Sequence, residues 1–316
     1  MKPLFEERMK TLLESEEDFS QFSGIIHEAP LNFIRCNTLK ITPEKLLDRL
    51  QRDWDVSTPF LNFPEIILVK SKLGPGELGN RIEHLLGFYY IQEISSMMSV
   101  LALEPKPDEL VLDLFASPGS KTTQMASYMK NRGTIIANDL KIERIKILSS
   151  NLDKAGATNT IITRKDAPNL CKELMKSRFQ KFDKILIDAP CSGEGTLRSS
   201  PKTLETWNFK VIKKLSREQK KFLALAVPLL IKGGTLVYST CTHAPEENEE
   251  IISFALENFP LKIEKLSLPL KCRAGITNWG GKRFHKGTEK ACRIYPQDND
   301  SEGFFVAKFT LMEEVE

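Results

Sequence analysis

The chain has 316 residues, 41% of them hydrophobic, which is enough for one large domain or two ordinary ones with an ample apolar core. Its 45 basic and 42 acidic residues leave a formal charge of only +3, so any face that binds nucleic acid must be local. The six cysteines include no C-x-x-C pair, which disfavours a zinc knuckle and a secreted disulfide framework. A secretory leader and an apolar run long enough to span a bilayer are not seen. We therefore expect a soluble, cytoplasmic protein with no metal centre and no membrane contact.

One disulfide stays open at this point. The chain is rich in Lys, Glu and Ile, a composition that suits a thermophile, and intracellular proteins of such organisms can carry disulfides. In that case Cys272 and Cys292 are the pair to consider.

Residues 1–84 are expected to form a small module of their own. Its first 24 residues have a charged, helical pattern, and a strand, a helix and a second strand follow. Pro43 stands in the first turn of that helix, a position that proline favours. The order suits a small α+β module, with its elements at 31–39, 42–50 and 65–69.

Residues 85–316 are expected to form the larger domain, which opens with a predicted helix over 85–103. From residue 109 onward strands and helices alternate, and this favours an α/β fold with a mostly parallel sheet, because parallel neighbours need crossover helices. A late strand is expected to join that sheet antiparallel. Strands are predicted at 110–115, 134–139, 160–163, 182–188, 234–239 and 302–309, and helices from 121, from 143, at 216–231 and at 245–258.

A tight turn after the first of these strands has the composition of a ligand-binding loop. In Asp113-Leu-Phe-Ala-Ser-Pro-Gly-Ser-Lys-Thr122, Gly119 lets the backbone approach a ligand, and the free amides of the new helix can donate to an adenosine or carboxylate group. The segment is neither G-x-G-x-x-G nor a P-loop, which disfavours a dinucleotide or an ATP phosphate. Asp139, at the end of the next strand, is placed to bind a ribose. We expect Arg144 to reach the same ligand and Asp166 to lie near an adenine.

Two cysteines follow strands that end at one edge of the predicted sheet. Cys191 stands in Asp188-Ala-Pro-Cys-Ser-Gly-Glu-Gly-Thr196 and Cys241 in Tyr238-Ser-Thr-Cys-Thr242. Open α/β folds place their chemistry at such strand ends, and a cysteine thiolate adds readily to an electron-poor carbon. A single cysteine of this kind would more often be an inert buried thiol, but a matched pair favours a catalytic role. From these residues alone either cysteine qualifies as the nucleophile.

Together these motifs resemble the RsmB/Sun family of RNA (cytosine-C5) methyltransferases, and the pattern is closest to its archaeal tRNA 5-methylcytosine methyltransferases. The departures are mild, at Phe115, Ser120 and Glu302, and none affects a candidate catalytic group. The likeness spans most of the chain: 34–38, 87–96, 113–122, Asn138-Asp139, Asp166, 188–196, 238–242, 245–248, Arg293, Pro296 and 302–305.

The resemblance implies a Rossmann-like methyltransferase domain that uses S-adenosylmethionine, with an RRM-like N-terminal module. It implies that Cys241 adds to carbon 6 of cytosine, that Asp188 holds the edge of the base, and that Cys191 assists product release. Lys121 is expected to lower a thiolate pKa or to assist proton transfer. The implied cofactor contacts are Ala116, Ser117, Pro118, Gly119, Ser120, Lys121, Thr122, Asp139, Arg144, Asp166 and Asp188.

RNA is the implied partner, and tRNA is favoured over rRNA because the chain matches the minimal members of the family. We expect the protein to be a monomer. Basic residues that could contact phosphates are Arg35, Arg81, Arg198, Lys202 and the loop 271–283.

Two other functions stay open. Asp188-Ala-Pro-Cys191 is similar to the Asp-Pro-Pro-aromatic motif of enzymes that methylate amino groups of bases, but this chain lacks the aromatic residue and would leave Cys241 without a role. A non-catalytic RNA-binding or ribosome-assembly factor could keep the fold. Loss of catalysis should have removed some of Lys121, Asp188, Cys191 and Cys241, and all four are present.

Overall fold

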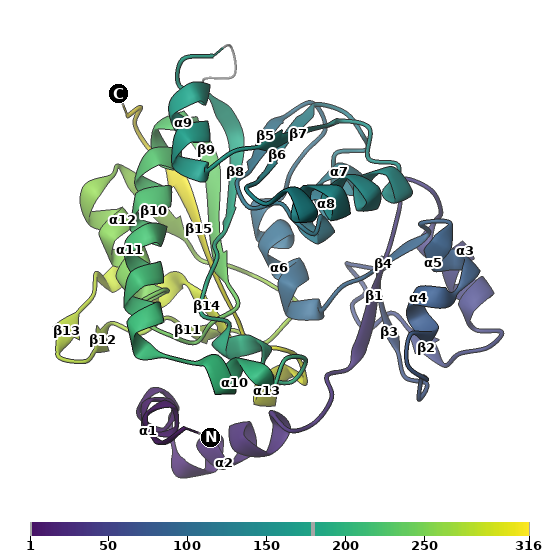
Figure 1. Cartoon of the computed structure of the whole chain (residues 1–316), viewed down its shortest axis with the longest axis horizontal. Coiled ribbons are helices and arrows are strands. Elements are labelled where there is room, and N and C mark those ends of the chain that lie inside the picture. Colours follow the sequence, from purple (N-terminus) through teal and green to yellow (C-terminus); the bar gives the residue numbers. More distant parts are fainter. Residues whose placement is uncertain (1, 178–180, 316) are drawn as a thin grey trace.

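The computed structural model describes residues 2–177 and 181–315, and its larger part is built on a nine-stranded sheet (Figure 1). Five strands run parallel in the order β9-β8-β5-β6-β7. The predicted α/β fold with a mostly parallel sheet is confirmed. These strands are β5 (Leu110–Asp113), β6 (Thr134–Asp139), β7 (Thr160–Arg164), β8 (Phe182–Asp188) and β9 (Leu230–Thr240).

Helices cover both faces of this sheet, as crossover connections require (Figure 1). Strand β8 shows why both faces are apolar: Ile185 and Ile187 pack into one core, and Leu186 packs into the other. One face carries α6 (Ile94–Leu103), α7 (Ser120–Tyr128) and α8 (Ile142–Ala155), and the other carries α9 (Ala167–Leu174), α11 (Phe209–Ala226) and α12 (Glu249–Asn258).

The late antiparallel strand is also confirmed. Strand β15 (Phe304–Leu311) pairs antiparallel with β9, and three short strands extend the sheet beyond it. These are β10 (Leu261–Glu264), β11 (Arg273–Ala274) and β14 (Cys292–Ile294); β12 (Asn278–Trp279) and β13 (Lys282–Arg283) form a separate hairpin. Within the described residues no helix is long and apolar enough to cross a membrane.

A second, four-stranded antiparallel sheet lies at the right of Figure 1, in the order β2-β3-β1-β4. Helix α3 (Pro43–Leu50) packs on it through the fully buried Leu46 and Leu50, and the side chain of Thr42 caps the helix. The predicted boundary between residues 84 and 85 precedes β4 and stays a prediction. The remaining elements are β1 (Asn32–Cys36), β2 (Val56–Ser57), β3 (Ile66–Val69), β4 (Tyr89–Ile91), α4 (Glu77–Asn80) and α5 (Ile82–Leu85).

The predicted single helix over 85–103 is wrong, because the chain forms β4 before α6 begins at Ile94. Gly87 has a φ of +71°, and a Cβ there would lie 2.0 Å from the Lys154 carbonyl oxygen, so the turn requires glycine. The residues that follow, Tyr89 to Ile91, favour strands.

The helix predicted at 216–231 is displaced along the chain in the structure. It begins seven residues earlier, at Phe209, where the side chain of Asn208 accepts a hydrogen bond from the Lys210 amide. It ends at Ala226, because Pro228 has no amide hydrogen to continue the helical bonding. Strand β9 therefore starts at Leu230 rather than at residue 234.

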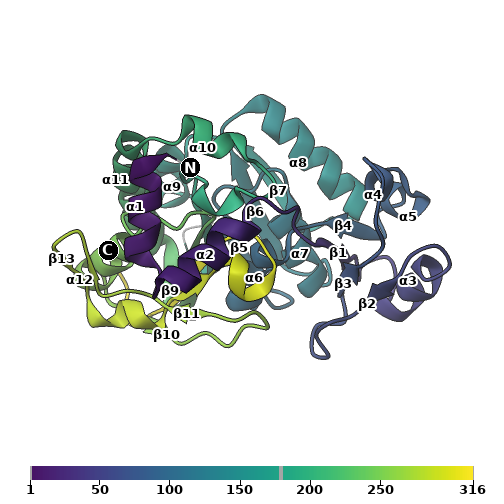
Figure 2. The same ribbon diagram turned by 90° about the horizontal axis from the view of Figure 1, so that it is seen from below.

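The charged N-terminal segment forms two helices, α1 (Pro3–Leu12) and α2 (Glu16–Ile25). They pack against the larger part of the protein, on the side shown in Figure 2, and not against the small sheet. Phe5 and Phe22 share an apolar cluster there with Trp207 and Tyr295. Two short helices, α10 (Lys202–Thr206) and α13 (Pro296–Asn299), lie nearby.

Arg35 joins the small sheet to the larger part. It projects from β1 and is only 2% exposed, which contradicts the expectation that it contacts RNA phosphate. Its guanidinium donates to the Ser120 carbonyl at 2.7 Å, to Thr123 Oγ1 at 2.8 Å and to Gln92 Oε1 at 2.5 Å. The small sheet is thus bonded to the first turn of α7.

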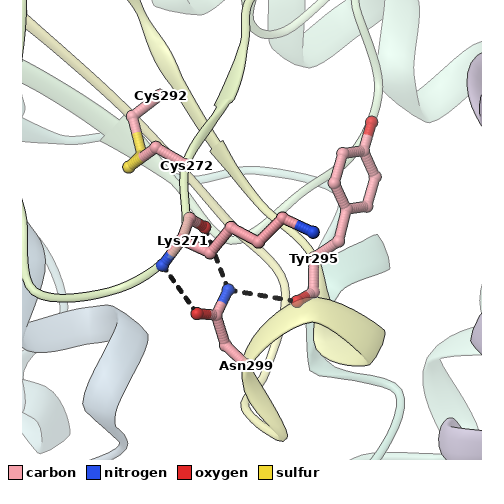
Figure 3. The surroundings of a disulfide bond; sticks show 5 residues. All are labelled: Lys271, Cys272, Cys292, Tyr295 and Asn299. Atoms are coloured by element: carbon pink, nitrogen blue, oxygen red, sulfur yellow. Dashed lines mark hydrogen bonds between the residues drawn. A yellow bond between two sulfur atoms is a disulfide. The ribbon is translucent and has the colours of Figure 1, made fainter.

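Cys272 and Cys292 form the disulfide that the sequence left open (Figure 3). The bond joins residues 20 positions apart and ties the segment before β11 to β14. Beside it, the Lys271 amide donates to Asn299 Oδ1 at 2.8 Å, and Asn299 Nδ2 donates to the Lys271 carbonyl at 3.0 Å. Arg273, the next residue after the disulfide, binds Asp18 of α2, so this corner also anchors the N-terminal helices.

Candidate active site

The register of the sheet brings the candidate catalytic residues together. Strands β8 and β9 are parallel neighbours, and Asp188 lies opposite Ser239 at their ends. Each strand continues into a loop that carries a cysteine, Cys191 after β8 and Cys241 after β9. The two sulfur atoms are consequently 3.1 Å apart, although the residues are 50 positions apart in sequence.

Asp188 is held by two donors. Lys121 Nζ, from the first turn of α7, lies 2.8 Å from Asp188 Oδ2, and Ser239 Oγ donates to Oδ1 at 2.7 Å. Lys121 also donates to Ser96 Oγ at 2.9 Å. The lysine side chain is 11% exposed and the aspartate side chain 25%. The carboxylate is therefore fixed in orientation and still reachable from the adjoining pockets.

The two cysteines differ in their surroundings. The hydrogen bond with Cys241 and burial raise the pKa of the Cys191 thiol well above its usual value, and the nearby carboxyl of Glu247 acts in the same direction. Cys191 is therefore a thiol at ordinary pH. Since both side chains are partly exposed, Cys191 can donate its S–H to a Cys241 sulfur that remains accessible.

The loops after the two cysteines are bonded to each other. The Gly195 amide donates to the Cys241 carbonyl at 2.9 Å, and the Gly303 amide donates to the Gly195 carbonyl at 2.8 Å. A Cβ on Gly195 would lie 2.1 Å from the Gly303 carbonyl oxygen, so the close approach requires glycine. Ser192 Oγ and Thr242 Oγ1 are 2.8 Å apart and add a second link.

A pocket of about 460 Å³ lies at the carboxyl ends of β5, β6 and β8. Asp139 is nearly buried in it, and Arg144 Nε donates to Asp139 Oδ2 at 3.0 Å. Arg144 also donates to the Ser117 carbonyl at 2.6 Å. Among the other lining residues are Phe115, Asn138, Asp166, Asp188, Cys191, Phe222 and Cys241.

A second pocket, of about 410 Å³, lies on the other side of Asp188, between the small sheet and the larger part. It is lined from both, with Phe33 of β1 and Lys121 of α7 among its walls. Asp188 and Cys241 line both pockets. A larger groove, of about 610 Å³, runs between α1, α11 and the β12–β13 hairpin; it contains none of the residues predicted for catalysis or cofactor binding, but Lys282 of the basic loop 271–283 lines it.

The residues of the predicted cofactor loop, 116–122, lie in three places: the first pocket, the second pocket and the turn itself. Ser117 lines the first pocket, whereas Pro118, Ser120 and Lys121 line the second. The other three shape the turn: Ala116 and Thr122 are buried, and Gly119 has a φ of +103°.

Asp113 lies beneath this turn. It is 1% exposed and accepts a hydrogen bond from Thr122 Oγ1 at 2.7 Å. Burial raises the pKa of its carboxyl to about 7, and the charge of Asp188 contributes to the rise. Asp113 is therefore protonated and neutral below about pH 7.

Several residues of the site carried no signal of their own in the sequence. Ser96 and Ser239 contact Lys121 and Asp188 from distant segments, and Phe222 reaches the first pocket from the middle of α11. Their segments could be recognised only as parts of a family motif or of an amphipathic helix. Among the described residues no group of His, Cys, Asp or Glu is arranged to hold a metal.

The prediction that Arg198 contacts RNA phosphate is wrong. Its side chain is buried and donates to the backbone carbonyls of Glu28, Ala29 and Ser301 and to the Asp300 carboxylate. It therefore anchors the segment after α2. The long-range partners that use up its donors are not visible in the local sequence.

Comparison with known proteins identifies the family. The family model described as 16S rRNA methyltransferase RsmB/F matches residues 100–310, and that of the N-terminal domain of 16S rRNA methyltransferase RsmF matches residues 1–94. The tRNA (cytosine(49)-C(5))-methyltransferase of Pyrococcus abyssi is 40% identical over 96% of this chain and 94% of its own length. The ribosomal RNA small subunit methyltransferase F of Psychromonas ingrahamii is 38% identical over 96% of this chain, which spans 62% of that longer protein.

Solved structures agree with this result. A methyltransferase homologue from Pyrococcus horikoshii has a TM-score of 0.85 at 33% identity, over 98% of this chain and 95% of the other. NSun6 from Pyrococcus horikoshii, solved with SFG, has a TM-score of 0.82 at 26% identity, over 98% of both chains. The family model matches two thirds of the chain, and the Pyrococcus abyssi relative is 40% identical over 96% of it, so the chain belongs to the RsmB/F methyltransferase family.

Proposed function

We propose that this protein transfers a methyl group from S-adenosylmethionine to carbon 5 of cytosine in RNA. The observation that carries the proposal is that two pockets meet at Asp188 and Cys241. A methyl donor in the first pocket and a cytosine in the second would face each other across these residues. The relatives named as cytosine-C5 and ribosomal RNA methyltransferases support the same reaction.

The first pocket fits the cofactor. Asp139 offers a carboxylate to ribose hydroxyls, and the exposed Asp166 offers one to an adenine amino group. Phe115 and Phe222, whose ring centroids are 4.9 Å apart, give the pocket an apolar wall for a purine. The relative solved with SFG, an analogue of S-adenosylmethionine, is in keeping with this assignment. When bound, the cofactor supplies an electrophilic methyl group.

Cys241 is the proposed nucleophile. Carbon 5 of cytosine is too weakly nucleophilic to take a methyl group directly, so a thiolate first forms a bond to carbon 6 and makes carbon 5 electron-rich. After methylation a water molecule takes the proton from carbon 5, the double bond re-forms, and the electron pair of the C6–S bond returns to sulfur. Cys241 lines both pockets, which is the position that this sequence of steps requires.

Asp188 and Lys121 would bind the cytosine base and stabilise the charge that develops on its ring. Asp188, oriented by Lys121 and Ser239, would accept a hydrogen bond from the N4 amino group of cytosine and share a proton with N3 as negative charge develops on the ring. Lys121 lines the second pocket and keeps a positive charge beside that carboxylate. Cys191 assists release, because its thiol can donate a hydrogen bond to the sulfur that leaves carbon 6.

We favour tRNA over rRNA as the substrate. The tRNA-modifying relative of Pyrococcus abyssi is 40% identical to this chain over 96% of its residues and supports this choice. Residues 1–84 would contribute to RNA binding beside the second pocket, and residues 85–316 would carry the catalytic centre. We also propose that the enzyme acts as a monomer in the cytoplasm.

The test uses the purified full chain with S-adenosylmethionine and unmodified tRNA or small-subunit rRNA transcripts, followed by bisulfite sequencing. Cys241→Ala should abolish methylation and form no covalent adduct, whereas Cys191→Ala should leave RNA bound to protein through denaturing electrophoresis. Cys171→Ala, which alters a buried thiol outside both pockets, is the control. An adduct in Cys241→Ala and none in Cys191→Ala would reverse the two roles. Methylation of rRNA but not of tRNA would reverse the choice of substrate.

A further inference from the structure

Two buried residues outside both pockets hold the segment that carries Cys191. Gln219 Nε2, from the middle of α11, donates to the Pro190 carbonyl at 2.9 Å. Glu247 Oε2 accepts from the Ser192 amide at 3.1 Å and from Gln219 Nε2 at 2.9 Å. The carbonyl before Cys191 and the amide after it are therefore fixed by one linked pair of side chains. Neither side chain of the pair is exposed.

A carboxylate at this place needs an explanation. In the described part of the chain no ion pair involves Glu247, and its Oε1 has no hydrogen-bond partner. Burying an unpaired carboxylate costs stability, and a neutral glutamine could accept the same two hydrogen bonds. The effect of the charge can therefore be separated from that of the hydrogen bonds by a glutamine at this position.

The titratable groups that face Glu247 come from three other elements of the structure. They are Glu194 after the Cys191 loop, Cys191 itself, and Tyr238 of β9, whose hydroxyl donates to the Glu247 carbonyl at 2.6 Å. Burial raises the pKa of Glu247 to about 7, the hydrogen bonds from Ser192 and Gln219 oppose the rise, and Glu194 adds to it. Glu247 is thus ionised at alkaline pH, the range in which Cys191 would lose its proton.

We propose that Glu247 and Gln219 are positioning residues that give the two thiols different roles: together they fix the Cys191 segment, and the Glu247 carboxylate, bonded to the amide next to Cys191, holds a negative charge near that thiol. Cys191 then keeps its proton and donates it as a hydrogen bond to the Cys241 sulfur. When the C6–S bond breaks, the electron pair returns to Cys241, and the S–H of Cys191 stabilises that thiolate. No bond to Cys191 forms or breaks. This inference rests on the proposed function for the part that Cys241 plays.

The charge is tested by alkylation, which needs neither RNA nor cofactor. In full-length protein with Cys241→Ser, the rate of iodoacetamide modification of Cys191 is followed by peptide mass spectrometry from pH 7 to 11, since the thiolate is the reactive form. Adding Glu247→Gln should lower the pH midpoint of Cys191 alkylation by about one unit. At a pH below the midpoints of both proteins, the rate should then rise about tenfold. The matched control is Glu246→Gln, which removes a charge that pairs with Arg8; the alkylation midpoint of Cys191 should not change. An unchanged midpoint with Glu247→Gln, or an equal change with Glu246→Gln, would overturn the proposal.

The positioning is tested separately with Gln219→Met, which removes both hydrogen bonds of Gln219 and keeps the Glu247 charge. The alkylation midpoint of Cys191 should not change, whereas the covalent RNA adduct should dissociate about tenfold more slowly, as expected for a loss of about 1.4 kcal/mol of stabilisation. Dissociation at the rate of the unchanged protein would refute the positioning role. A lowered midpoint in Glu247→Gln without any RNA methylation by the unchanged protein would support the charge effect and reject the proposed function. Methylation without a lowered midpoint would do the reverse.

Discussion

Replacing Asp113 by asparagine should make the stability of the protein less dependent on pH. Asp113 is almost fully buried, one of its oxygens has no hydrogen-bond partner in the described structure, and the other accepts from Thr122. Burial raises the pKa of the carboxyl from 3.8 to about 7 in the folded protein. Asparagine keeps the shape and the acceptor and cannot ionise.

The raised pKa of Asp113 determines how stability changes with pH. Because the folded-state pKa lies above the unfolded one, the folded protein holds the proton more tightly, and the associated stability is present at low pH and is lost as the pH rises through about 7. A difference of one pH unit between the two pKa values corresponds to about 1.4 kcal/mol, so from pH 5 to pH 8 Asp113 should lower the free energy of unfolding by about 3 kcal/mol. Glu247, whose pKa also rises to about 7, contributes in the same direction in both proteins and cancels in the comparison.

The assay is urea unfolding of the unchanged protein and of Asp113→Asn at several pH values from 5 to 8. The unchanged protein should lose stability relative to the asparagine variant as the pH rises, because the difference between the two free energies of unfolding changes by about 3 kcal/mol over this range. Two curves that run parallel would show that Asp113 does not titrate in this range and would refute the reasoning.

Two further changes test the cofactor pocket and the contact between the two sheets. Asp139→Ala should weaken the binding of S-adenosylmethionine about tenfold, as measured by calorimetry, because a charged hydrogen bond worth roughly 1.4 kcal/mol is lost. A change within twofold would refute the ribose assignment. Asp48→Ala, at an exposed position, is the control. Arg35→Met should lower the free energy of unfolding by about 3 kcal/mol, because it leaves Gln92 Oε1 without its donor and removes the bonds that join β1 to Ser120 and Thr123 of α7. Lys202→Met on the exposed α10 should change it by less than about 0.5 kcal/mol, and equal effects would contradict the structure.

The strand ends could be predicted from sequence because their signals are local. The apolar runs before Asp188 and Cys241 mark buried strands, and parallel strands end at a common edge, so the pairing of β8 with β9 brings the two motifs together. The spacing of the helices between strands then determines that the sheet is parallel. What the motifs could not supply is the register, which sets the distance of 3.1 Å between the two sulfurs.

The misassigned arginines show the limit of local patterns. Arg35 and Arg198 are charged residues, and in isolation a solvated or phosphate-binding role is the simplest expectation. Their burial depends on acceptors far along the chain: Arg35 reaches residues 57 to 88 positions away, and Arg198 reaches residues 102 to 170 positions away. The same holds for Gln219 and Glu247, which act on Cys191 from segments 28 and 56 positions away. Side chains that act through the backbone of another segment leave no motif of their own.

The first turn of α7 connects the parts of the proposed reaction. It carries Lys121, which binds Asp188, and it follows Ser117, which lines the first pocket, the one proposed for the cofactor. Arg35 donates to the Ser120 carbonyl in this same turn, so a residue of the small sheet fixes the backbone next to Lys121. Under the proposed function, an RNA bound to the small sheet would lie at a set distance from the lysine and its carboxylate. Misplacing a reacting group by about 1 Å can cost a factor of about 100 in rate, so the proposed function gives this buried arginine a role that offsets the cost of its burial.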